Sequence, residues 1–156
     1  MKGSSNLKTP GCCWCKNDRV TYGNIYGALN NGYTVNTKKL CPTDWHVPSD
    51  AEWSILITFL GGEALARGKM KEAGTTHWKE SNTGVTNESG FSGLPGGFRD
   101  YDGYFLTIGN YCDWWSSTES STTRAWARTL GYDSSALGRG EGSKTDGFGV
   151  RCVRDL

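Results

Sequence analysis

The stretch that most constrains the fold is residues 41–62, CPTDWHVPSDAEWSILITFLGG. Ser49 precedes the apolar run and Glu52 follows three residues later, which is the capping-box arrangement found at helix starts. The residues that recur at helical spacing on one apolar face are Trp53, Leu56, Ile57 and Leu60. Two glycines at positions 61 and 62 then provide a stop. We predict a helix over about residues 50–60 and a second, shorter helix over about residues 63–72.

Outside this stretch the chain has few aliphatic residues and many turn formers. Only 36% of the residues are hydrophobic and 22 are Gly, so the seven Trp, seven Tyr and five Phe must supply much of the core. Residues 77–105 predict long ordered loops pinned by Trp78, Phe91, Leu94 and Phe98. Short runs predict strands over 113–119, 124–131 and 147–155, and a first strand within 20–29. The expected fold class is α+β, with two helices, a small antiparallel sheet and long ordered loops.

The length of 156 residues suits one domain with a real core. Residues 1–20 are polar, Cys-rich and aperiodic, so we interpret them as an N-terminal extension and residues 21–156 as the domain. The formal net charge of +1 gives no electrostatic reason to expect nucleic acid or an anionic membrane as a partner. No apolar run approaches the length of a membrane span. Residues 1–15 lack a signal-peptide core, and we expect a native leader to have been replaced.

The six cysteines favour disulfides over a metal site. They are Cys12, Cys13, Cys15, Cys41, Cys112 and Cys152. The CCWC run invites a zinc interpretation, but no second close pair of Cys or His completes a set of four ligands. A bridge between Cys41 and Cys152 would tie the start of the core to its end and close a large loop. The sequence leaves the pairing of the other four open. We expect no metal and no cofactor.

Several longer motifs run in fixed order: CPTDWHVPSDAEW, GGEALARGKMKEAGTTHW, NTGVTNESGFSGLPGGFRDYDGYF, DWWSST and DGFGVRCVRD. Between about Tyr22 and Asp155 this order resembles the Fibrobacter succinogenes major paralogous domain family of bacterial surface and secreted proteins. That family is similar to the C-type lectin fold, which is also seen in the formylglycine-generating enzymes. The resemblance implies a C-type lectin-like fold and an extracellular or cell-surface location, with a virion surface as an alternative.

The resemblance extends to the variable proteins of diversity-generating retroelements, systems that mutate a C-terminal segment at adenine positions of a template. Here that segment would lie between about Tyr111 and Cys152. Asn codons mutated at their adenines cannot yield Lys, Glu, Gln, Met or Trp, and residues 120–139 contain only Trp126 from that set. No Asn follows Asn110. Both observations fit a diversified copy, and both also fit an ordinary loop rich in Ser and Gly.

The candidate ligand-binding surface is residues 121–142, where Tyr, Ser, Gly, Asp and Arg are common and aliphatic residues are scarce. Tyr supplies rigid amphipathic area, and Ser and Gly supply adaptable hydrogen bonding. The residues assigned to this surface are Thr122, Arg124, Trp126, Arg128, Tyr132, Asp133, Ser135 and Arg139, joined from preceding segments by Tyr101, Tyr104, Tyr111, Asp113 and Trp114. A solvated hairpin loop is the alternative.

Four tryptophans receive structural assignments. Of the adjacent Trp114 and Trp115, one ring is expected in the core and the other on the binding face, because successive side chains of a strand alternate. Trp45 and Trp53 flank the start of the predicted helix, and both are assigned to the core.

The sequence argues against calcium-dependent sugar binding and against catalysis. The sugar-binding lectins of this fold carry Glu-Pro-Asn or Gln-Pro-Asp and Trp-Asn-Asp motifs, which this chain lacks. His46 and His77 stand beside no candidate nucleophile. The formylglycine-generating enzymes have two closely spaced cysteines shortly before their C-terminal motif, whereas here Cys112 lies far upstream of Cys152.

We therefore expect non-catalytic binding of a protein or glycan on another cell or host surface. The first alternative is a fixed-specificity secreted or cell-surface module with an adhesive or structural role. The second is an oxidase like the formylglycine-generating enzymes.

Overall fold

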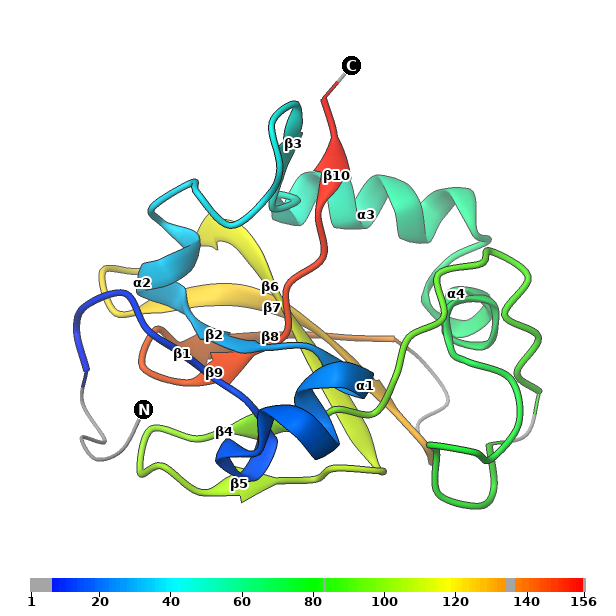
Figure 1. Cartoon of the computed structure of the whole chain (residues 1–156). Coiled ribbons are helices and arrows are strands. Elements are labelled where there is room, and N and C mark those ends of the chain that lie inside the picture. The colour runs from blue at the N-terminus through cyan, green and yellow to red at the C-terminus, as the bar shows by residue number, and fades with distance from the viewer. Residues whose placement is uncertain (1–6, 83, 134–136, 156) are drawn as a thin grey trace.

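The computed structural model describes residues 7–82, 84–133 and 137–155. Its two longest helices, α3 (Asp50–Phe59) and α4 (Glu63–Met70), pack beside a set of antiparallel sheets (Figure 1). The shorter helical elements are η1 (Cys15–Asn17), η2 (Arg19–Gly23), α1 (Asn24–Tyr26) and α2 (Gly32–Val35). The architecture is α+β, as the sequence predicts.

The strands form three sheets among the described residues. The five-stranded sheet has the order β1 (Cys12–Cys13), β2 (Leu29–Asn31), β9 (Gly147–Phe148), β4 (Phe98–Arg99) and β5 (Phe105–Leu106). The three-stranded sheet consists of β6 (Tyr111–Glu119), β7 (Arg124–Gly131) and β8 (Gly138–Ser143). A third pairing joins β3 (Trp45–His46) to β10 (Val153–Arg154).

The predicted helix at residues 50–60 is confirmed as α3, and the shorter one as α4. Glu52 N–H donates to Ser49 Oγ at 3.2 Å, and Ser49 N–H donates to Glu52 Oε2 at 2.8 Å. This reciprocal pair satisfies two backbone donors that a helix start leaves free. Trp53 and Ile57 are buried on the inner face of α3, as the spacing predicts.

Strand β6 separates two hydrophobic cores. Trp114 belongs to the core that α3 and α4 cover, whereas Trp115 belongs to the core beneath α2 and β9. The prediction of one ring on each face is confirmed, but both faces of the strand are internal: the two residues are 5% and 0% exposed. Trp115 Nε1–H donates to Asn30 C=O at 2.7 Å, so its polar group is satisfied inside the core.

The N-terminal region differs from the prediction of a strand within residues 20–29. Asp18 caps this segment by accepting a hydrogen bond from Thr21 N–H at 2.9 Å, and the chain then turns through η2 and α1 before β2 begins at Leu29. Local capping of the backbone competes with extended structure here. Cys12 and Cys13, which lie in the segment interpreted as an extension, pair with β2 and form the edge of the five-stranded sheet.

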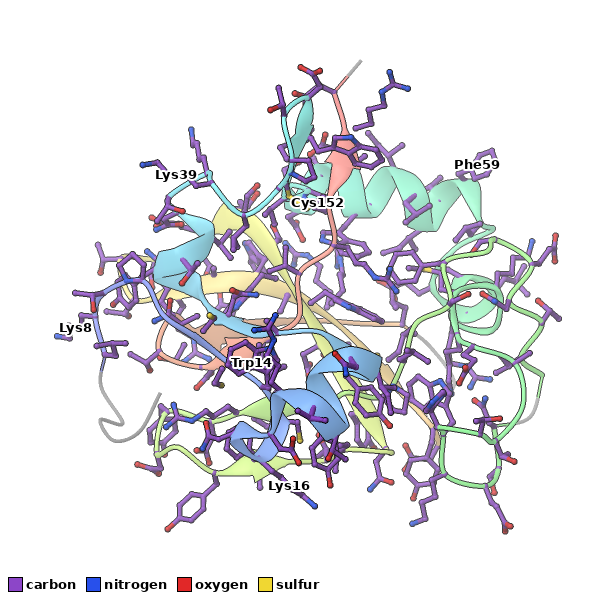
Figure 2. All side chains as sticks on the ribbon, viewed as in Figure 1. Lys8, Trp14, Lys16, Lys39, Phe59 and Cys152 are labelled. Atoms are coloured by element: carbon purple, nitrogen blue, oxygen red, sulfur yellow. A yellow bond between two sulfur atoms is a disulfide. The ribbon has the colours of Figure 1, made fainter. Side chains whose placement is uncertain are left out.

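The C-terminal strand predicted over residues 147–155 is divided into β9 and β10, which join different sheets. The disulfide between Cys41 and Cys152 is confirmed, with an S–S distance of 1.96 Å, and it lies beside β10 (Figure 2). The assignment of Trp45 to the core is wrong: the residue is 42% exposed, because β3 pairs only with β10 among the described strands.

His46 fastens this end of the chain to the start of α3. Its Nδ1 contacts Asp155 Oδ1, and its Nε2 contacts Glu52 Oε1 at 2.8 Å. The hydrogen bonds to Asp155 and Glu52 raise the pKa of His46. The His46 ring therefore has a structural role, as its position near the start of the helix suggests.

Candidate ligand-binding surface

The segment that the sequence singles out as a surface is a regular β-hairpin. Strand β7 occupies the predicted residues 124–131, and β8 pairs with it from Gly138 to Ser143. The sequence gives no sign of β8, because GRGEGS lacks β-branched and aromatic residues. Because side chains alternate along β7, Ala125 and Ala127 face a core, whereas Arg124 and Trp126 lie on the other face of the strand.

Four side chains on that outer face form the β7–β8 surface, defined as Arg124, Trp126, Arg139 and Glu141. The guanidinium carbon of Arg139 lies 3.4 Å from the centroid of the Trp126 ring. Arg124 Nε lies 3.3 Å from Glu141 Oε2, and Arg124 Nη2 donates to Glu141 C=O at 2.9 Å. The side chains of Arg124, Arg139 and Glu141 are 50%, 40% and 39% exposed, so a partner can reach this aromatic and charged patch.

The outer edge of β8 adds backbone groups to this patch. Lys144 N–H donates to Thr123 C=O at 2.9 Å, and the pairing register stays constant along β7 and β8. Because hydrogen-bonded and non-hydrogen-bonded pairs alternate in an antiparallel ladder, the backbone N–H and C=O groups of Arg139 and Glu141 point away from β7. Strand β8 is the last strand of its sheet, so these groups face outward beside the exposed side chains, and the Glu141 C=O is the one among them that Arg124 contacts.

Arg128, predicted as a surface anchor, is buried and points at α3. It is 1% exposed, and its Nη2 donates to Asp50 Oδ1 at 2.8 Å and to Ser54 Oγ at 3.0 Å. The same Asp50 carboxylate accepts hydrogen bonds from Arg139 Nε and Nη2. One carboxylate thus joins the first residue of α3 to both strands of the hairpin. Burial excludes Arg128 from the surface, and Trp114 is excluded for the same reason.

Asp113 is also directed inward. It accepts a hydrogen bond from Thr129 Oγ1, and burial raises its pKa to about 6. The nearby Asp146 carboxylate contributes to this rise, and burial raises its own pKa to about 6 as well. Asp113 therefore belongs to the interior of the scaffold and carries a charge at neutral pH that its surroundings disfavour.

Replacing Asp113 with Asn should raise the free energy of unfolding at pH 7.5 by about 2 kcal/mol, allowing for partial solvent screening. The pKa of Asp113 in the folded protein, about 6, exceeds the ordinary Asp value. The protonated carboxyl therefore makes its full contribution to stability below about pH 4, and this contribution is lost as the pH rises through 6. The gain should therefore vanish near pH 4. Denaturant unfolding at both pH values measures it, with the exposed Asp102→Asn as control. A loss of stability in Asp113→Asn at both pH values would contradict this assignment.

The predicted tyrosines lie at different places. Tyr111 O–H donates to Asp133 Oδ1 at 2.7 Å, and the Tyr111 ring meets Tyr132 edge-on at 6.2 Å between centroids. Lys79 Nζ lies 4.7 Å from the centroid of the Tyr132 ring. Tyr111 pairs with the last residue of β7, so this aromatic cluster is at the end of the sheet far from the β6–β7 turn.

The other predicted residues are dispersed. Tyr101 and Tyr104 are exposed in the turn between β4 and β5, and Thr122 is exposed in the turn between β6 and β7. The backbone N–H of Tyr101 interacts with Asp146, which places its turn beside the one that follows β8. Ser135 lies outside the described residues.

The described part of the domain also has a small hollow and a larger groove away from this surface. The smaller, of about 250 Å³, is lined by Val35, Lys38, Leu40, Cys41, His46, Val47 and Ser117. The larger is a groove of about 770 Å³ beside α1. In the part of the chain that the structure describes, no group of three or more His, Cys, Asp or Glu side chains could hold a metal ion. No helix within the described ranges is long and apolar enough to cross a membrane.

A family model described as the Fibrobacter succinogenes major domain matches residues 2–154. The matched range includes the Cys-rich N-terminal segment, which lies outside the motifs on which the sequence resemblance rests. This inclusion is consistent with the structure, in which β1 of that segment pairs with β2 of the domain. No curated protein and no solved structure matches the chain significantly.

Proposed function

The chain belongs to the Fibrobacter succinogenes major domain family, and from this premise we propose that it is a non-catalytic binding protein that presents the β7–β8 surface to a ligand. The observation that carries the proposal is the Arg139 guanidinium stacked 3.4 Å over the half-buried Trp126 ring on paired strands. Trp and Arg are the residues most enriched at energetic centres of binding interfaces. The partner we propose is a protein or glycan on another cell or host surface.

The rigidity of the support favours ligand binding at this surface. Asp50 fixes Arg139 to α3 with hydrogen bonds of 2.9 to 3.2 Å, so little side-chain entropy remains to be lost when a ligand is bound. Ala125 and Ala127 hold the opposite face of β7 in a core. Antiparallel sheets with two flanking helices also suit the proposed C-type lectin-like scaffold, and we propose an extracellular or cell-surface location on the same resemblance.

In the finer form of the proposal, a retroelement diversifies this surface. Thr122, Arg124 and Arg139 are residues that Asn codons mutated at adenines can yield, whereas Trp126 and Glu141 are not. Trp126 and Glu141 would then be constant anchors within a variable rim. The neighbouring DNA should hold a reverse transcriptase and a near-copy of the coding segment that differs only at adenines. Without such a template, the fixed-specificity adhesive or structural module replaces this form.

The binding surface is tested with Trp126→Ala and a matched control. The labelled protein is applied to an array of bacterial and host glycans and to intact bacterial cells. We expect binding to at least one of them and a loss of at least about tenfold in affinity in Trp126→Ala. Phe59 is 85% exposed at the end of α3 (Figure 2), whereas Arg139 of the β7–β8 surface contacts Asp50 at the start of that helix, so Phe59→Ala should bind as the unchanged protein does. Equal binding by both variants would refute the β7–β8 surface.

A further inference from the structure

The groove beside α1 has a single charged residue in its lining. Its walls come from the end of η2, α1 and the residues that follow it, and from the segment between β9 and β10. Asn30, Leu40, Ser92, Leu94 and Trp114 complete the lining. Figure 1 shows α1 beside that last segment. Tyr26, Leu94 and Val150 supply apolar wall, and Arg151 supplies the charge. No Asp, Glu or Lys lines the groove within the described residues.

The guanidinium of Arg151 is held in place on one side. Its Nη2 donates to Phe91 C=O at 3.0 Å and to Ser92 C=O at 3.3 Å. Its central carbon lies 4.6 Å from the centroid of the Phe91 ring, which covers one face of the cation. These contacts fix the orientation of the guanidinium without neutralising its charge.

The remaining donors of Arg151 are open. A guanidinium has five N–H donors, and the two carbonyl contacts use only Nη2. Across residues 7–82, 84–133 and 137–155, Nε and Nη1 contact no acceptor, and neither atom is sealed from solvent. No carboxylate in this range forms an ion pair with Arg151. Arg151 is a lining residue of the groove.

We propose that the α1 groove binds a small ring-bearing organic carboxylate, with an open N–H donor of Arg151 contacting the carboxylate and Tyr26, Leu94 and Val150 contacting the ring. The open Nε–H and Nη1–H donors lie on different edges of the guanidinium, and each can donate a charge-assisted hydrogen bond to a carboxylate oxygen. A groove of about 770 Å³ falls within the usual range for small-molecule sites. Aromatic acids and sugar acids share this chemistry, and the experiment separates them.

The site lies apart from the β7–β8 surface. Trp114 is bridged to Gly149 on one side of β6, whereas β7 pairs along the other side. Trp126 does not line the groove. A failure of ligand binding in the groove would therefore not contradict the proposed function, and a failure of binding at the β7–β8 surface would not contradict the groove site.

The test is an NMR titration of the whole chain with two matched probe pairs. Phenylacetate is compared with phenylacetamide, and D-galacturonate with D-galactose. We expect the Trp114 indole resonance to shift, and one carboxylate to bind at least about tenfold more tightly than its neutral partner. Preference for phenylacetate identifies an aromatic acid, and preference for D-galacturonate identifies a sugar acid. Equal shifts from charged and neutral partners, or no shift from either carboxylate, would overturn the proposal.

Ile25 provides variants that leave Arg151 intact. It is 44% exposed and lines the groove, so Ile25→Glu places a competing negative charge at the rim. This variant should weaken carboxylate binding by at least about fivefold, while Ile25→Gln should stay within about twofold. Arg151→Lys keeps the charge but loses the planar guanidinium that Phe91 and the two carbonyls hold in place, and it should weaken binding about tenfold. If Ile25→Glu binds the carboxylate as Ile25→Gln does, the site is not the α1 groove.

Discussion

Replacing Asp50 with Ala lowers the free energy of unfolding by about 3 to 5 kcal/mol, because it leaves the buried Arg128 cation without its counter-ion. The side chain of Arg128 is 2% exposed, and Asp50 is the carboxylate that contacts it, at 2.8 Å. The substitution also removes a negative charge from the first turn of α3, where the helix dipole favours it. Denaturant unfolding followed by circular dichroism measures the loss.

Two further variants separate the buried pair from the exposed one. Arg139→Ala removes a partner of Asp50 that is 40% exposed, and it should cost no more than about 1 kcal/mol. Arg128→Met in the Asp50→Ala background removes the stranded cation while keeping side-chain volume, and it should restore part of the lost stability. A loss below about 1 kcal/mol in Asp50→Ala itself would contradict the assigned geometry.

Removing the disulfide with Cys41→Ser and Cys152→Ser should lower the free energy of unfolding by about 3 to 5 kcal/mol. The two cysteines are 111 residues apart, so the bridge restricts most of the unfolded chain. It also joins the loop before β3 to the segment before β10, and these strands pair with each other. The double variant should therefore lose order in the β3–β10 pair first, which hydrogen exchange detects.

Reduction of the unchanged protein provides an independent check of the bridge. A thiol reductant should reproduce the stability loss of the double variant and should leave the double variant itself unaffected. Cys12 is a free, exposed thiol, so Cys12→Ser serves as the control and should match the unchanged protein. If the reductant destabilises the double variant as much as the unchanged protein, the stabilising bond is not Cys41–Cys152.

Local signals in the sequence are sufficient for α3 and for much of the central sheet. The capping box of Ser49 and Glu52 operates within four residues, so no distant contact is needed to start that helix. The aromatic run at 113–119 and the segment 124–131 likewise predict β6 and β7. The first strand expected within 20–29 fails because Asp18 caps a helical turn there.

The candidate surface was predicted only in part, because exposure is not a local property. The sequence assigns Arg124, Trp126 and Arg139 to one surface, and the structure places them on one face of the β7–β8 hairpin, but the sequence gives Arg128 the same expected role. Alternation puts Arg128 on the same face of β7 as Trp126, and only the position of α3 decides that one is covered and the other reachable. Tyr101 lies beside the turn that follows β8, whereas Tyr111 lies at the far end of the three-stranded sheet.

The sequence by itself determined the helix α3, the strands β6 and β7 and the family, and it singled out Cys41 and Cys152 as a candidate bridge. Each depends on short-range patterns or on residue identity. The tertiary structure alone decided that GRGEGS is a strand, since a Gly-rich segment becomes extended only when β7 satisfies its backbone. It also decided which charges are buried and which donors of Arg151 stay open. Those outcomes depend on contacts between segments far apart in the chain, and burial is what gives them their energetic weight.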